Sequence, residues 1–230
     1  MAGLQDIINQ AGSIEINRRK VVGVQITRNE IPRTSLTPTR NPWRFTIDMP
    51  PVLSWNAARS LVEYLDNLDR YSPQEINFNN SCISFIFRYQ GQLSTGQLAL
   101  FTVQSFTGNT LVLTGLPTVS PTVIMFEPND LIQIGANPYP FTVVNQVVRG
   151  STGTVTLTTN RPNFFTTSVV GAGLTVGSGC TFNLFCPNMP TYKLVPGNYA
   201  LNNTTGAVLN KARVEFSDVF ELYEFVGSAA

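Results

Sequence analysis

Alternation of apolar and polar residues is the dominant pattern in this sequence. From Trp43 to Met49 every odd position is apolar and every even position is polar, and Pro50-Pro51 follows. A strand places successive side chains on opposite faces of a sheet, and proline is rare inside one. The segment 43–49 is therefore predicted to be a strand with one buried and one exposed face.

The same period of two recurs in three other segments. Their apolar members are Val22, Val24 and Ile26, then Ile83, Phe85, Phe87 and Tyr89, and finally Val214, Phe216, Phe220 and Leu222. Asp218 interrupts the last set, and the opposite face of that strand reads Arg213, Glu215, Ser217, Val219 and Glu221. Half-buried strands of this kind are typical of antiparallel sheets with one face in water.

Residues 54–70 follow a helical period instead. The apolar residues of this segment recur every three or four positions, at Ala58, Leu61, Val62, Leu65 and Leu68. Such spacing gives a helix one apolar stripe. Ser54 is a good N-cap, Ser72-Pro73 is a stop signal, and Asp66 and Arg70 are spaced to pair. We predict one amphipathic helix packed on a sheet.

Residues 107–165 are predicted to form a small inserted β domain, within a main β domain that comprises 1–106 and 166–230. The insertion would contain strands at 110–114, 131–134, 141–148 and 154–158, the last two joined by a hairpin turn at 149–153. Its segment 117–128 is a proline-rich connector. Outside it, 171–179 is predicted to be a glycine-rich flexible loop, 180–185 a strand, 187–210 loop with short strands, and 28–42 an extended arm.

Charged residues make up only 13% of the chain, about half the usual share. Charge is depleted at the centres of protein interfaces, so this deficit favours a protein that covers much of its surface with neighbours. A monomer solvated by Thr, Asn, Ser and Gln is the alternative. With a net charge of +1, the chain is not typical of proteins that bind nucleic acid through clustered basic residues.

The charges are unevenly distributed along the chain. Residues 1–50 hold seven of the fifteen basic residues, which are Arg18, Arg19, Lys20, Arg28, Arg33, Arg40 and Arg44. The last sixteen residues carry Glu215, Asp218, Glu221 and Glu224 and no basic residue. A head-to-tail assembly can use this asymmetry, with the basic region of one subunit meeting the acidic region of the next.

The sequence does not favour an enzyme, a metal or a cofactor. It contains no histidine, the commonest general base and a frequent zinc ligand. Cys180 and Cys186 have no second pair to complete a four-ligand site, so we interpret them as buried structural thiols. The glycines between 171 and 179 lack the phosphate-binding patterns, and Asp66 and Asp69 fit a solvated helix face.

The cysteine count and the start of the chain bear on its compartment. Three cysteines (Cys82, Cys180 and Cys186) and no apolar signal segment after Met1 favour an intracellular origin with reduced thiols. No apolar run approaches the ~20 residues needed to cross a bilayer, so membrane insertion is not expected.

Three stretches resemble a known family. They are Trp43–Arg70, a strand followed by a helix; Glu127-Pro-Asn-Asp130-Leu-Ile-Gln-Ile-Gly135 with its continuation to Arg161-Pro162; and Met189–Leu194 with Phe216–Val226. The chain is similar to the tail-tube-type structural proteins of tailed bacteriophages, which include tube proteins, distal tail proteins and baseplate hub or tube-initiator proteins. The resemblance implies a mainly β fold, a β-sandwich or split barrel with one flanking α-helix and a small inserted β unit.

The resemblance also implies a role. Such subunits form rings, usually hexamers, around a channel through which phage DNA passes, and they contact other tail and baseplate proteins within a virion assembled in the host cytoplasm. Glu215, Ser217 and Glu221 are then candidate channel-lining residues. Candidate inter-subunit residues are Arg18, Arg19, Lys20, Arg28, Arg33 and Arg40. The alternatives are a receptor- or carbohydrate-binding tail adaptor, with the insertion as its recognition surface, and a neck, connector or baseplate wedge protein.

Overall fold

The computed structural model describes residues 3–17, 22–26, 32–36, 42–49, 53–67, 73–187, 190–195, 200–201, 208–209 and 213–225. Within these ranges strands far outnumber helices, and all the paired strands are antiparallel. The prediction of a mainly β protein is confirmed.

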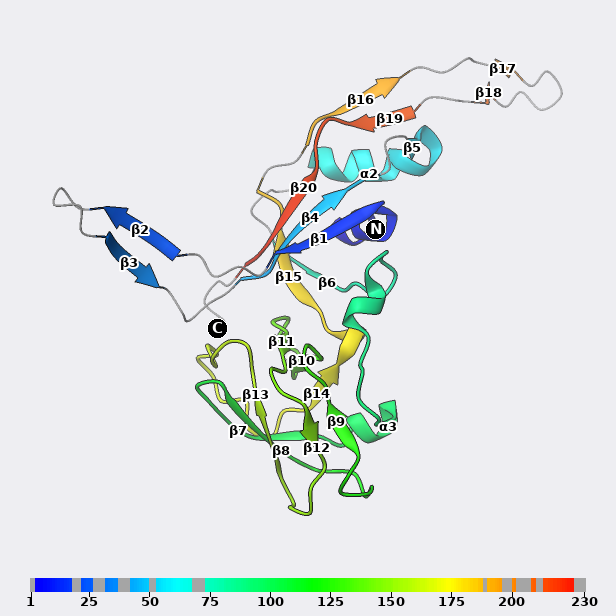
Figure 1. The fold of residues 1–230 in the computed structure, drawn as a ribbon. Coiled ribbons are helices and arrows are strands. Elements are labelled where there is room, and N and C mark those ends of the chain that lie inside the picture. Colours follow the sequence, from blue (N-terminus) through cyan, green and yellow to red (C-terminus); the bar gives the residue numbers. More distant parts are fainter. Residues whose placement is uncertain are drawn as a thin grey trace.

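A five-stranded sheet lies near the middle of the molecule (Figure 1). Its strands follow the order β1 (Ser13–Asn17), β4 (Arg44–Asp48), β20 (Phe220–Glu224), β15 (Phe182–Phe185) and β6 (Gln74–Ile76). Neighbouring β4 and β20 come from opposite ends of the chain, with Phe45 opposite Leu222. The sheet therefore brings together segments that are far apart in the sequence.

One face of this sheet carries the first core. Its centre is aromatic: the ring of Phe182 lies 5.1 Å from that of Trp43, 5.4 Å from that of Phe45 and 5.3 Å from that of Phe78. Helix α1 (Leu4–Gln10) adds Leu4, Ile7 and Ile8, whose helical spacing places them together. Burying each such large side chain is worth about 1.5–3 kcal/mol. This helix, only seven residues long, was not predicted from the sequence.

The predicted amphipathic helix is confirmed as α2 (Trp55–Asn67). It packs against a three-stranded sheet of β16 (Tyr192–Val195), β19 (Arg213–Phe216) and β5 (Leu53–Ser54), where Ala58 and Val62 contact Val214. Ser54 belongs to β5. Residues 68–70 lie outside the described residues, so the predicted Asp66–Arg70 pair does too. Asp66 is exposed and accepts a hydrogen bond of 2.8 Å from the Tyr192 hydroxyl.

The inserted β region contains three small sheets, in the lower part of Figure 1. The first combines β13 (Val155–Thr158), β8 (Thr110–Thr114) and β7 (Thr102–Thr107). The second combines β11 (Phe141–Thr142), β10 (Leu131–Ile134) and β14 (Leu174–Val176), and the third pairs β12 (Val147–Val148) with β9 (Ile124–Phe126). A short helix, α3 (Thr95–Leu98), begins at Ser94, whose hydroxyl accepts the Gln97 N–H.

These sheets enclose the second core. Its fully buried members run from Leu93 to Val169, so it draws on residues on both sides of the predicted range 107–165. The bounds 107–165 of a separate domain stay a prediction. All four residues of β10 are buried, because Leu131 packs into the first core while Ile132 and Ile134 pack into the second. β10 is thus a shared wall between the two cores.

A buried ion pair also joins the two cores. The Arg161 guanidinium donates two hydrogen bonds of 2.7 Å to the Glu224 carboxylate, and both side chains have no exposed surface. The Trp43 N–H donates to the same carboxylate at 3.0 Å, and Arg161 also donates to the Pro140 carbonyl at 2.9 Å. Buried charges are stable only when paired and hydrogen-bonded, as here.

Two hairpins lie apart from both cores in Figure 1. One pairs β2 (Val22–Ile26) with β3 (Pro32–Leu36), and the other pairs β17 (Ala200–Leu201) with β18 (Val208–Leu209). The strand at 22–26 was predicted. The arm predicted at 28–42 contains β3, so at least its described part is a paired strand rather than an extended arm.

The predicted strand at 83–89 is wrong. Ser84–Phe87 is a 3-10 helix, η1, closed by the Ile86 N–H donating to the Ile83 carbonyl at 2.9 Å. Ile83 and Phe87, four apart, are buried, while Phe85 between them is 64% exposed. An apolar run this short is compatible with either the strand period or the helical period. The turn at Asn79–Ser84 leads into a helical conformation.

Four other sequence predictions need correction. The proline-rich segment 117–128 is not only a connector, because it contains β9. The segment 141–148 is two short strands in different sheets, and β12 and β13 pair with β9 and β8 rather than with each other. Arg149 shapes the turn between them by donating to the Pro117 carbonyl at 3.2 Å and the Thr152 carbonyl at 2.6 Å. The last alternating segment is also two strands, β19 and β20, separated by Ser217–Val219.

The glycine-rich segment 171–179 is not simply a loop. It contains β14 and a second 3-10 helix, η2 (Gly177–Gly179). Gly177 has a φ of +77°, and a Cβ at this position would lie 2.9 Å from the Tyr89 backbone nitrogen. The glycine is required by close backbone packing beside η1. The strand at 180–185 is confirmed as β15, and 187–210 contains short strands as predicted.

Candidate functional site

The second face of the five-stranded sheet carries polar side chains. We call it the open face, because each residue that β1, β4, β20, β15 and β6 direct to this side is exposed or half-buried. From β1 to β6 these residues are Ser13, Glu15, Asn17, Arg44, Thr46, Asp48, Glu221, Tyr223, Asn183, Phe185 and Glu75. The pairing register places them in cross-strand rows, such as Glu15 beside Thr46 and Thr46 beside Glu221.

Negative charge predominates on the open face. Four of its residues are carboxylates (Glu15, Asp48, Glu75 and Glu221), and Arg44 is its one basic residue. This imbalance follows from the sequence pattern, because Arg44 and Asp48 of β4 and Glu221 of β20 lie on this face, whereas the opposite positions are apolar except for the buried Glu224. The open face therefore has a negative electrostatic potential.

Arg44, Glu221 and Tyr223 form a small network on this face. The Arg44 guanidinium forms an ion pair with one Glu221 oxygen, and the Tyr223 hydroxyl donates to the other at 2.8 Å. The guanidinium also lies 5.0 Å from the centre of the Tyr223 ring. The hydrogen bond from Tyr223, and then that from Arg44, lower the pKa of Glu221. Burial, followed by the bond to Glu221, raises the pKa of Tyr223.

Aromatic rings border this network. The Phe185 ring lies 6.1 Å from that of Tyr223 and 5.8 Å from that of Phe225, and Phe225 is 40% exposed. Asn183 connects this edge to the inserted region by donating to the Tyr139 hydroxyl at 3.2 Å. The open face thus changes from an acidic half near β1 to an aromatic half near β15.

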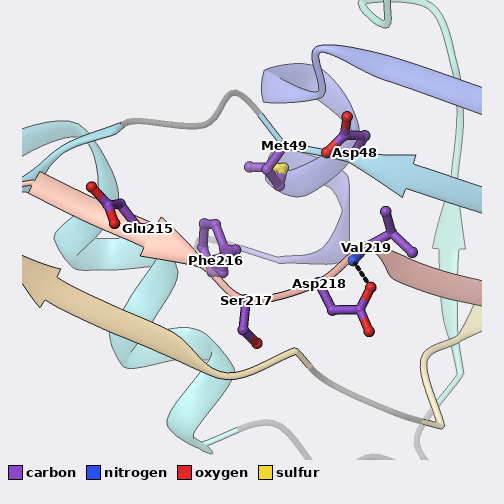
Figure 2. A pocket seen from close by; sticks show the side chains of 7 residues that line it. All are labelled: Asp48, Met49, Glu215, Phe216, Ser217, Asp218 and Val219. Carbon is purple, nitrogen blue, oxygen red and sulfur yellow. Dashed lines mark hydrogen bonds between the residues drawn. The ribbon is translucent and has the colours of Figure 1, made fainter.

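A pocket of about 440 Å³ lies where β4 ends and the chain passes from β19 to β20 (Figure 2). It is lined by Asp48, Met49, Glu215, Phe216, Ser217, Asp218 and Val219. The Asp218 carboxylate accepts the Val219 N–H at 2.8 Å, and the Ser217 hydroxyl is 2.7 Å from that of Thr191. These two contacts stabilise the bend that separates β19 from β20.

The structure divides the predicted channel-lining residues between two places. Glu215 and Ser217 line the pocket, whereas Glu221 lies on the open face and binds Arg44. They do not share one strand, because the chain leaves one sheet and enters another at Ser217–Val219. Their role in a channel stays a prediction.

Of the predicted inter-subunit residues, Arg18, Arg19, Lys20, Arg28 and Arg40 lie outside the described residues. Arg33 is in β3, opposite Gln25, and only its backbone is described.

Sequence reasoning missed the Arg161–Glu224 pair, although a signal for it existed. Glu224 lies on the same face of β20 as the buried Phe220 and Leu222. Arg161 is one of only four charged residues between Tyr89 and Tyr192. A lone charge in an apolar region and an acidic residue on an apolar face are each unusual. Their separation by 63 residues concealed the pairing.

The remaining ionisable and thiol side chains of the described residues bear on metal binding and on reactivity. No group of three or more potential metal ligands occurs among them. Cys180 and Cys186 are buried, as predicted, and burial raises the pKa of the Cys180 thiol to about 12, so this thiol stays protonated at neutral pH. Asp130 is buried because its carboxylate accepts the N–H groups of Gln90 and Glu127, each at 2.8 Å.

The inserted region does not present an aromatic recognition surface. Its aromatic residues between 107 and 165, which are Phe126, Tyr139, Phe141, Phe164 and Phe165, are buried or half-buried. A sugar-binding surface would expose such rings. In addition, none of the helices in the described ranges has the length and apolar character of a membrane span.

No protein-family model and no curated protein matches this chain.

Proposed function

We propose that this protein is a structural ring subunit of a bacteriophage tail or baseplate, such as a hub, distal tail or tube-initiator protein. In this proposal identical copies, most simply six, surround a channel through which DNA passes, and the ring also binds other tail proteins. The protein acts in the virion tail, assembled in the cytoplasm of the host bacterium.

The observation that carries the proposal is the hairpin β2–β3. It has five paired residues on each strand and lies apart from both cores in Figure 1. An isolated two-stranded hairpin is at best marginally stable in water, so such an element needs a surface to cover it. A neighbouring copy in a ring supplies that surface without any new partner.

Two further features support assembly. β1 and β6 end the five-stranded sheet on either side, and the Gln5 side chain of α1 already binds the Asn77 backbone beside β6. A sheet edge that is not protected in this way favours pairing with another chain. The low share of charged residues, 13%, is consistent with a surface that neighbours cover. The open face suits a channel wall, because an acidic surface repels DNA phosphates and so prevents DNA from adhering as it passes.

The proposal is tested by measuring the mass of the purified protein by light scattering over a range of concentrations, together with electron microscopy. We expect rings with about six times the subunit mass of 25.3 kDa. A variant Gln25→Pro, which removes a backbone donor from the hairpin, should weaken ring formation and leave thermal melting of the cores unchanged. A monomer at every concentration would contradict the proposal.

A further inference from the structure

The pocket beside the open face has the composition of a site for a basic side chain. Asp48 and Asp218 lie at its exposed rim, and neither forms an ion pair within the described part of the chain. Met49, Phe216 and Val219 supply apolar surface below the rim. Arginine and lysine bury an aliphatic stem against such surface while the charged end binds carboxylates, and a guanidinium also stacks on an aromatic ring.

The described basic residues near the pocket do not neutralise Asp48 and Asp218. Arg44, on the same strand as Asp48, is already bound to Glu221. Lys193 lies opposite Glu215 in the β16–β19 pair, so Glu215 has a positive neighbour, but Asp48 and Asp218 do not share it. Within the described ranges, Asp48 and Asp218 therefore have no ion-pair partner at the mouth of the pocket.

The densest positive charge in the chain follows the other end of the same strand pair. Arg18, Arg19 and Lys20, which we call the basic triad, come directly after Asn17. Asn17 pairs with Arg44, whereas Asp48 pairs with Ser13, so the acidic and basic ends are separated by the length of β1. Four residues of strand span about 13 Å. In the sequence the basic triad thus follows the end of β1 that is farther from Asp48, and opposite charges of this kind favour pairing between copies.

We propose that the pocket receives the basic triad of a second copy of this chain, as a head-to-tail contact between ring neighbours. This inference rests on the proposed function and names the contact. The contact is heterologous, because one subunit contributes the pocket and the next contributes the triad, and such contacts form a ring when the rotation between neighbours closes. The triad also precedes β2 by one residue, so a hairpin that covers a neighbour would bring the triad to that neighbour.

Charge reversal on each side of the contact tests this proposal. A pocket variant, Asp48→Lys with Asp218→Lys, and a triad variant, Arg18→Glu with Arg19→Glu, should each raise the concentration needed for ring formation by about tenfold or more, since like charges then meet. A control variant, Asn79→Lys with Asn80→Lys, introduces the same number of lysines in an exposed turn and should assemble like the wild type.

Mixing the two variants gives the decisive measurement. A lysine pocket then meets a glutamate triad and an unchanged pocket meets an unchanged triad, so the mixture should form rings in which the two variants alternate. Recovery of rings also proves that both variants fold. If the wild type forms rings and the pocket variant assembles equally well, or if mixing restores nothing, the inference fails and the proposed ring stands. If the wild type never assembles, both fail.

Discussion

Two glutamates three residues apart on β20 form ion pairs in opposite environments. Glu221 faces outward and binds Arg44, and the two side chains are 31% and 40% exposed. Glu224 faces inward and binds Arg161, and neither side chain is exposed. Both pairs join a glutamate of the same strand to an arginine, so they compare one type of ion pair in two different surroundings.

The surroundings decide what each pair contributes. The buried pair has additional partners: the Trp43 N–H donates to Glu224, and Arg161 lies 5.0 Å and 4.9 Å from the ring centres of Phe141 and Phe164. It therefore links β4, β20 and the inserted region. The exposed pair joins only neighbouring strands, and water competes for both charges. One pair sets how the two cores meet, whereas the other shapes the surface.

Removing one partner of the buried pair should have the largest effect. We expect Glu224→Gln to lower the free energy of unfolding by about 3–5 kcal/mol, because it leaves the Arg161 charge buried without a carboxylate. Urea denaturation measures this loss, and Glu221→Gln, three residues away, is the matched control with an expected loss under about 1 kcal/mol. Equal losses in the two variants would contradict the comparison.

Replacing both buried partners should be less harmful than replacing one. We expect the double variant Arg161→Met with Glu224→Leu to be more stable than either single variant, because no unpaired charge remains. It should still fall below the wild type by about 1–3 kcal/mol, since the Trp43 N–H loses its acceptor. A double-mutant cycle measures the coupling; additive losses would show that the two side chains do not act as a pair.

The exposed and the buried ion pair should respond differently to salt. Raising the salt concentration to about 1 M shortens the screening length to about 3 Å and weakens exposed ion pairs far more than buried ones. The destabilisation by Arg44→Ala, expected to be under about 1 kcal/mol at low salt, should therefore nearly vanish. That of Glu224→Gln should persist. Denaturation of both variants at low and high salt provides the measurement, and a large salt effect on Glu224→Gln would be the contrary result.

The smallest effect concerns pH. The folded-state pKa of Glu221 lies below its unfolded value, so its contribution to stability is present above the ordinary glutamate pKa and is lost as pH falls through the lower, folded-state pKa. Tyr223 has a raised pKa, so its contribution is present below the ordinary tyrosine pKa and is lost as pH rises through the folded-state value.

Both pH effects should be under about 1 kcal/mol, because the groups are exposed to solvent. The variant Tyr223→Phe should remove the alkaline loss and weaken the acidic one. The test is to measure the urea concentration at the unfolding midpoint over a range from acidic to alkaline pH, for the variant and for the wild type. If Tyr223→Phe loses as much stability at alkaline pH as the wild type does, the result would argue against the Tyr223–Glu221 hydrogen bond.

Sequence patterns predicted the elements in which neighbouring residues decide the conformation. The alternation at 43–49 and the helical stripe at 54–70 are both long enough to specify a period, and both are confirmed. The pattern at 83–89 was too short, and a 3-10 helix formed there. At the candidate site, the alternation correctly places Glu221 on the polar face of β20, whereas Glu215 lies in β19 of another sheet and Ser217 in the bend between them, and the channel-lining role of all three stays a prediction.

By itself, the sequence determined the β character of this protein, the faces of its longest strands, the position of α2 and the buried state of Cys180 and Cys186. The first three follow from the local order of apolar and polar residues, and the burial of the cysteines from the lack of further metal ligands in the sequence. Only the tertiary structure decided that Glu224 is buried, that β10 separates two cores, and that Asp48 and Asp218 share a pocket. Those outcomes depend on contacts between residues distant along the chain, and no local pattern encodes which distant segment will supply the partner.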